Sequence, residues 1–135
     1  MDILVDGDTS AVNEDPDCPL ICFCKVVGPE PFSLVGREAI DRFDFHALRD
    51  RRIGVVTEVP TPWLTLQEDL RRSGINPQAL DQGPARTMAD NVVALANRDV
   101  DVIQVMEPYT EATIQAGGHL WHAFAWRGDV VFTSF

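Results

Sequence analysis

The sequence predicts an α/β domain: three αβα layers around a mixed, largely parallel sheet, forming one lobe of a larger protein. From residue 52 onward, short apolar segments alternate with helical segments of about three turns, as in parallel strands joined by right-handed crossovers. Two of the apolar segments, within 53–63 and 100–109, run into a helix that begins at a proline. Each such helix has its unpaired N–H groups at the carboxyl end of a buried strand.

Composition fits a single globular domain. The chain has 135 residues and is 45% hydrophobic, which is typical of an ordered protein. Its formal net charge of −10 argues against a nucleic-acid partner, and no basic run is present to hold a membrane surface. No apolar stretch reaches the ~18 residues of a membrane helix, and residues 1–4 lack the positive charge of a signal peptide. As it stands the chain is expected in the cytoplasm, or in the periplasm if the full-length protein carries a signal.

The first third of the chain is expected to hold three strands, at 3–5, 19–27 and 32–35. The run 19–27 is apolar except for Lys25, which favours a buried strand. Asp44 is a suitable cap for a short helical turn over 44–50, which leads into a strand at 52–57.

The strongest helix signal covers 62–73. Thr61 is expected to cap this helix, Pro62 suits its first turn, and Gly74 stops it. Thr87 and Asp90 match the acidic form of a capping box. The remaining expected elements are a turn at 76–80, helices at 87–97 and 108–116, and strands at 100–106, 119–126 and 130–135.

Four side chains are candidates for small-molecule binding, because ligands of open α/β sheets gather where the strands end. They are Thr61, Trp63, Glu107 and Tyr109. Trp63 either stacks on a flat ligand or packs its helix on the sheet, and Glu107 either caps the next helix or accepts hydrogen bonds from a ligand. Tyr109 offers a ring and a hydroxyl. The helix that starts at Thr61 offers a further alternative, an anion bound by its free N–H groups.

The cysteines are few and unevenly placed. Cys18, Cys22 and Cys24 are an odd count in one stretch, which is a poor disulfide framework, so buried structural thiols are the preferred interpretation. Metal or redox use with His119 and His122 is the alternative. Against it, Cys-x-Cys is not the usual zinc spacing, and histidines three apart on a regular strand point to opposite faces.

No catalytic motif stands out. The sequence contains no nucleophile elbow, no phosphate loop and no His-Glu-x-x-His, and His46 is interpreted as a surface or packing residue. We therefore expect no catalytic residues, no metal and no cofactor.

Several segments in order resemble the SsuA/THI5-like (NMT1/THI5-like) family of type II periplasmic-binding-protein folds. They are 32–38, 48–55, 61–63, 69–75, 91–95, 101–108 and 132–135. Segment 48–55 is similar to the family's Leu-Lys-Gly-Lys-x-Ile-Gly-Val entry to the second lobe, with Asp50 in place of the glycine. The resemblance runs from about Cys18 to Phe135, and family members are much longer.

This resemblance implies the small-molecule-binding component of an ABC-type uptake system, with a permease as partner. The implied ligand is of the pyrimidine-precursor, sulfonate or nitrate class, with Trp63 stacking, Glu107 accepting from ring amino groups and Tyr109 flanking. It also implies that 1–36 is the end of the first lobe with hinge-proximal strands, 37–129 the second lobe, and 130–135 the return hinge strand.

Two alternatives accompany this interpretation. The family's thiamine-pyrimidine synthases keep their catalytic lysine and histidine in the part this chain lacks, so one alternative is a synthase-like protein without its catalytic part. The other is a truncated, self-associating domain without tight ligand binding. A lobe without its partner exposes apolar hinge surface, so we expect a homo-oligomer formed through 19–27 and 130–135.

Overall fold

The computed structural model describes residues 29–128. The strands expected at 3–5, 19–27 and 130–135 and all three cysteines lie outside the described residues. The chain divides into two compact units, one of residues 31–124 and one of residues 1–30 with 125–135. The sheet and the α-helices belong to the first unit. The lobe boundaries at 36 and 130 stay predictions, because they concern a longer, two-lobed protein.

A five-stranded mixed sheet forms the centre of this unit, in the order β3-β2-β4-β1-β5. The strands are β1 (Ser33–Gly36), β2 (Arg52–Gly54), β3 (Asp81–Gln82), β4 (Val102–Val105) and β5 (His119–Ala123). β2 pairs in parallel with β3 and β4, whereas β1 runs antiparallel to both β4 and β5. The expected mixed, largely parallel sheet is therefore confirmed.

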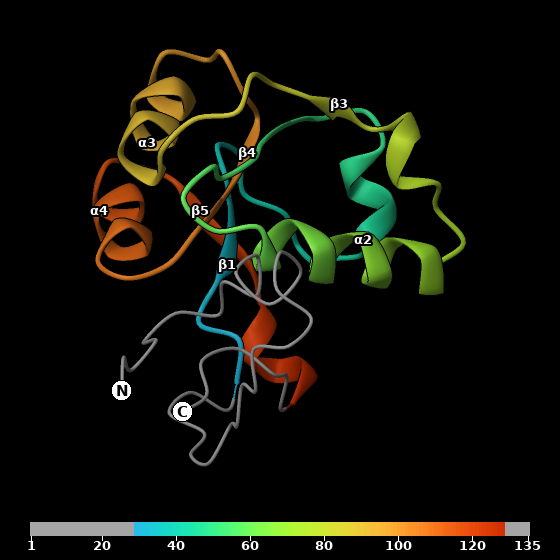
Figure 1. Cartoon of the computed structure of the whole chain (residues 1–135). Coiled ribbons are helices and arrows are strands. Elements are labelled where there is room, and N and C mark those ends of the chain that lie inside the picture. The colour runs from blue at the N-terminus through green and yellow to red at the C-terminus, as the bar shows by residue number, and fades with distance from the viewer. Residues whose placement is uncertain (1–28, 129–135) are drawn as a thin grey trace, which may run out of the picture. The chain divides into compact units, whose positions relative to one another are not determined.

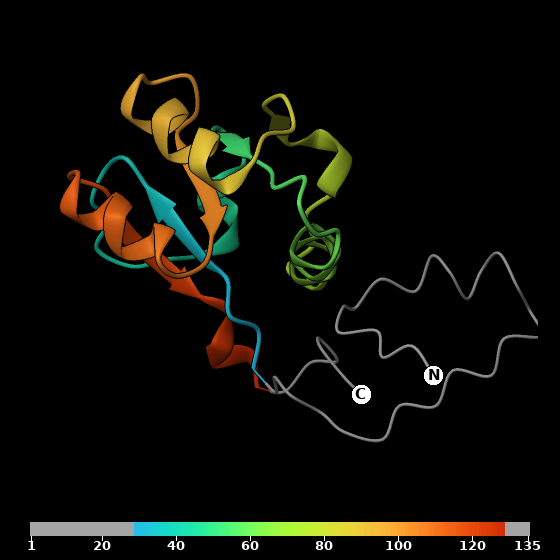
Figure 2. The same ribbon diagram turned by 60° about the vertical axis from the view of Figure 1, so that its left-hand side comes forward.

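Helices cover the sheet on two sides, as expected (Figures 1 and 2). The α-helices are α2 (Thr61–Arg72), α3 (Met88–Ala96) and α4 (Tyr109–Gln115), and the 3-10 turns are η1 (Phe45–Leu48), η2 (Pro77–Ala79) and η3 (Phe124–Arg127). α3 and α4 lie side by side on one side of the sheet, and α2 lies on the other. All four residues of β4 are buried, which is typical of a strand covered on both faces.

The expected cap of α2 is wrong. The helix begins at Thr61 itself, after Pro60, and no side chain caps it. A cap residue normally has an extended backbone, but Pro60 already has helical torsion angles, with φ −79° and ψ −26°. Thr61 is thus the first residue of the helix. By contrast, the capping box of α3 is confirmed, because the Thr87 side chain accepts the N–H of Asp90.

β5 contains a bulge that the sequence analysis did not foresee. Leu34 pairs with His122 and Val35 with Leu120, so Trp121 is the extra residue. The opposite faces expected for His119 and His122 hold for a regular strand only, and the bulge removes that regularity. Their partners on β1 are Gly36 and Leu34, which share a face, so the two histidines share one as well.

Trp121 packs directly over the β1 backbone. The side chain is buried, and its indole N–H donates to the carbonyl of Glu38 at 2.8 Å. A Cβ atom added to Gly36 would lie 2.1 Å from Cε2 of this ring. Only glycine at position 36 leaves room for the indole.

Gly36→Ala is expected to lower the free energy of unfolding by about 3 kcal/mol, the upper part of the range for overpacking. Urea denaturation checks this value. In a Trp121→Leu background the same substitution should cost less than about 1 kcal/mol, because the overlapping ring is gone. An equal cost in both backgrounds would contradict the assigned contact.

Candidate functional site

The structure brings the two predicted helix starts to one edge of the sheet. β2 leads towards α2 and β4 leads into α4, so both helices begin where parallel strands end. The side-chain amide of Gln104, on β4, donates to the carbonyl of Pro62 at 2.8 Å. This hydrogen bond joins the first turn of α2 to the strand. This edge, which we call the binding edge, carries Thr61 and Trp63 on α2 with Glu107 and Tyr109 at α4.

The start of α2 has no side-chain acceptor for its N–H groups. Pro62 lacks an N–H, and the N–H of Leu64 bonds to the carbonyl of Pro60 at 3.2 Å. The N–H groups of Thr61 and Trp63 are therefore the donors that this end of the helix offers, together with the positive end of its dipole. Such an arrangement favours an anion.

The other two helices begin differently. At α3, the carboxylate of Glu58 accepts the N–H of Met88 at 2.8 Å, in addition to the Thr87 cap. At α4, Oε2 of Glu107 accepts the N–H of Glu111 at 3.2 Å. Within residues 29–128, α2 is thus the α-helix whose first-turn N–H groups donate to no side-chain oxygen.

Glu107 has the first of its two predicted roles, since it caps α4. Its side chain is exposed, and no hydrogen bond to its other oxygen, Oε1, is found among the described residues. The ligand role stays a prediction for that oxygen. Tyr109 is the first residue of α4 and is half-buried.

Trp63 is half-buried rather than part of the core. The buried stripe of α2 consists of Pro62, Leu66 and Leu70, so Trp63 lies beside this stripe and not within it. No ring contact or hydrogen bond joins Trp63 to Glu107 or Tyr109 among residues 29–128. Its ring is part of the surface at the start of α2, where it is available to flank a ligand.

Sequence reasoning missed Gln104, which lies at the centre of this edge. The residue is 1% exposed, and its Oε1 has no hydrogen-bond partner within the described part of the chain. A buried amide oxygen without a partner is costly, by about 1–3 kcal/mol. The signal was available in the sequence as one amide inside the apolar run Val102–Val105.

The histidines have structural surroundings. His122 stacks on Phe43 with ring centroids 5.0 Å apart, and it packs edge-on against Phe45 and Phe124. His46 lies on the surface. Its backbone N–H donates to the carboxylate of Asp44, and its ring also hydrogen-bonds that carboxylate. These two bonds, the backbone bond above all, lower the pKa of Asp44. Residues 29–128 contain no group of three His, Cys, Asp or Glu side chains arranged to hold a metal. None of their helices is long and apolar enough to span a membrane.

Solved structures resemble this fold. SsuA of Escherichia coli, a periplasmic aliphatic sulphonate-binding protein, matches with a TM-score of 0.66 and 16% identity over 82% of this chain. The alkanesulfonate-binding SsuA of Xanthomonas axonopodis pv. citri, bound to MOPS, matches with 0.63 and 18% over 78%. PhnD1 of Prochlorococcus marinus, in complex with methylphosphonate, matches with 0.60 and 11% over 76%.

The fold that the sequence resemblance implies is thereby confirmed, because the chain has the fold of a part of these periplasmic binding proteins. No protein-family model and no curated protein matches the sequence. The matches cover 38%, 36% and 43% of the three solved chains, so this chain spans well under half the length of each. Both SsuA proteins are described as binding proteins.

Glu107→Ala is expected to lower the free energy of unfolding by about 0.5–1 kcal/mol, because it removes the cap of α4. Glu107→Gln should lose less, since the amide oxygen still accepts the N–H of Glu111. Urea denaturation of the two variants measures both effects. If the alanine variant is as stable as the parent, this hydrogen bond contributes nothing to α4.

Proposed function

We propose that this chain is one lobe of the solute-binding component of an ABC-type uptake system, and that its binding edge captures a small molecule with an anionic group of the sulfonate class. The observation that carries this proposal is the uncapped start of α2, which offers the N–H groups of Thr61 and Trp63. The ligands named for the solved structures of similar fold, MOPS and methylphosphonate, support the choice of an anion.

The first turn of α2, Gln104 and Tyr109 each have a role in this proposal. The first turn of α2 donates to the anionic oxygens, and the ring of Trp63 covers the apolar part of the ligand. Gln104 fixes the position of that turn through the carbonyl of Pro62. Tyr109 flanks the ligand from α4, and the first lobe of a longer protein would close over it. A permease is the proposed partner, and a full-length protein with an export signal would be periplasmic.

A pyrimidine precursor is the second candidate ligand. The exposed carboxylate of Glu107 favours it, because Oε1 can accept from ring amino groups while Oε2 caps α4. Trp63 would then stack on the ring. Nitrate remains the smallest ligand of the proposed anionic type. A synthase-like protein without its catalytic part would retain the same pyrimidine contacts.

The sulfonate proposal is tested with ethanesulfonate in an NMR titration of the whole chain. The backbone N–H signals of Thr61 and Trp63 should shift and saturate, because they donate to the anion. Thr61→Asp should abolish these shifts, since its carboxylate occupies the positive end of the helix dipole, while raising the unfolding temperature. Thr61→Asn is the matched uncharged control and should retain binding.

Glu107→Gln separates the two ligand classes. It should leave ethanesulfonate binding unchanged but weaken binding of an aminopyrimidine by about 1.5–3 kcal/mol, the range for a charge-assisted hydrogen bond. Shifts at Thr61 and Trp63 no larger than those produced by sodium chloride at equal ionic strength, for sulfonate, nitrate and aminopyrimidine alike, would reject a ligand at this edge.

Self-association is also proposed, through 19–27 and 130–135, which are largely apolar in sequence. The net charge of −10 opposes it, so assembly should strengthen as salt screens that charge. Light scattering at micromolar concentration over a range of salt measures the mass directly. A monomer throughout that range would reject the prediction.

A further inference from the structure

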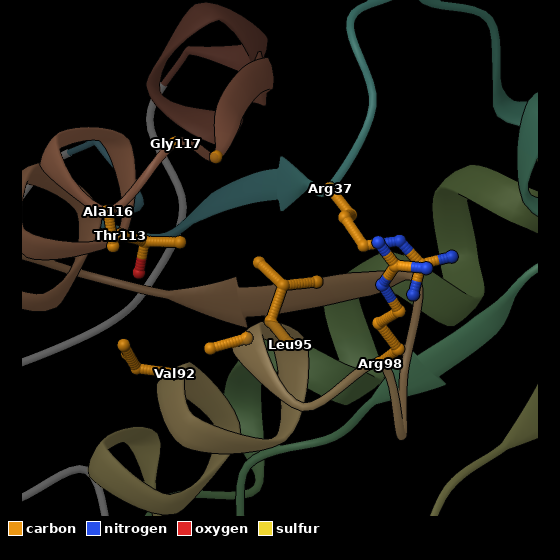
Figure 3. Close-up of a pocket in the computed structure, with 9 residues that line it drawn as sticks. Arg37, Val92, Leu95, Arg98, Thr113, Ala116 and Gly117 are labelled. Atoms are coloured by element: carbon orange, nitrogen blue, oxygen red, sulfur yellow. The ribbon is translucent and has the colours of Figure 1, made fainter.

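A cavity of about 210 Å3 lies at the other end of the lobe from the binding edge. Its walls come from Val92 and Leu95 on α3 and from Thr113 and Ala116 at α4, with Arg37 and Arg98 at its mouth (Figure 3). The N–H of Arg37 bonds to the carbonyl of Asp101, the residue before β4 begins. The binding edge instead lies where β4 ends, so the two places are separate.

The position of Arg98 in the chain is unusual. It follows Asn97, the C-cap of α3, and its φ is +65°, in the left-handed region that disfavours side chains other than glycine. Its N–H bonds to the carbonyl of Leu95, and the N–H of Asp99 bonds to that of Ala94. This hydrogen-bond pair defines a Schellman motif, whose left-handed residue is usually glycine.

The same motif ends the other two α-helices with glycine. After α2, Gly74 has φ +75°, and after α4, Gly117 has φ +96°. Arg98 is the exception, and it is also the residue whose side chain reaches the mouth of the cavity (Figure 3). A strained backbone that carries a long cation to a cavity indicates a role for that cation.

The charges at the mouth are unbalanced. Arg37 is paired with Asp101, whose Oδ1 lies 2.7 Å from Nη2 and whose Oδ2 accepts the N–H of Arg52. Arg98 forms no ion pair or hydrogen bond through its side chain within residues 29–128, and neither does the carboxylate of the adjacent Asp99. Figure 3 shows the guanidinium groups of Arg37 and Arg98 side by side. The lining of the cavity itself includes these two guanidinium groups and no carboxylate, since neither Asp99 nor Asp101 is part of it.

We propose that this cavity binds a small aliphatic carboxylate, with the carboxylate on the guanidinium of Arg98 beside Arg37 and the hydrocarbon part against Val92 and Leu95. A planar guanidinium matches a carboxylate in a paired arrangement. The volume lies below the roughly 300–1,000 Å3 typical of pockets for drug-sized ligands, which suits a short chain. This inference does not depend on the function proposed for the binding edge.

Pentanoate is the probe, added to the whole chain and followed by NMR. Backbone signals of Leu95 and Thr113 should shift and saturate. Arg98→Gly should weaken binding about tenfold, which corresponds to the loss of one charge-assisted hydrogen bond, and should raise the unfolding temperature because glycine suits the left-handed backbone. A weaker-binding but more stable variant cannot be explained by misfolding. Arg72→Gln, which removes a cation from the exposed face of α2, should leave pentanoate binding unchanged.

Three results would overturn the proposal. They are shifts no larger than those from sodium chloride at equal ionic strength, equal binding of pentan-1-ol, and unchanged binding by Arg98→Gly. Inorganic phosphate binding as tightly as pentanoate would overturn the assignment to an aliphatic carboxylate. The two sites fail independently, because Thr61→Asp should leave pentanoate shifts at Leu95 unchanged and Arg98→Gly should leave sulfonate shifts at Trp63 unchanged.

Discussion

The pairing of β1 with both β4 and β5 holds the described domain together. β4 and β5 are separated along the chain by α4, and the strand that joins them in the sheet comes from the start of the described region. Leu34 and Val35 are both fully buried, so β1 contributes to the core on each face of the sheet. The indole of Trp121 packs over Gly36 at the end of the strand. A change in this register would displace β5 and the α3–α4 layer together.

The register of β1 also sets the two ends of the lobe. At one end, Ser33 pairs with Val105, just before the chain enters α4 and the binding edge. At the other end, Gly36 pairs with Val102, so Arg37 reaches Asp101 through both its backbone and its side chain. The binding edge and the cavity are thus fixed by the same strand but presented to solvent at opposite ends of it.

Elements with a clear hydrophobic period were predictable from sequence. The three α-helices and strands β1, β2, β4 and β5 were expected near their observed positions, because their apolar residues repeat with the period of the element. β3 was missed since Asp81 and Gln82 are polar and exposed, and its pairing with β2 depends on tertiary context. The bulge at Trp121 was missed because one extra residue does not change an apolar pattern. The cap expected at Thr61 failed because Pro60 already adopts the helical backbone.

The candidate residues at the helix starts were identifiable from the sequence, and the buried residue that positions them was not. Trp63, Glu107 and Tyr109 were identified because each follows an apolar run that ends at a proline. Gln104 was not, because its importance depends on a contact with the carbonyl of Pro62, 42 residues away. No local pattern encodes such a contact. Residues that position a site from inside the core are therefore harder to find than those on its surface.

Two buried amides show how the binding edge is held in place. Gln104 donates to the carbonyl of Pro62 on the α2 side, and Asn91 of α3 donates to the carbonyl of Val55, directly after β2, at 3.1 Å. Each amide therefore satisfies a carbonyl near the carboxyl end of a parallel strand. In each case the amide oxygen has no partner among the described residues, at a cost of about 1–3 kcal/mol per group. An apolar side chain at either position would avoid that cost but remove the hydrogen bond that joins the two elements, so the pair favours a fixed edge over maximal stability.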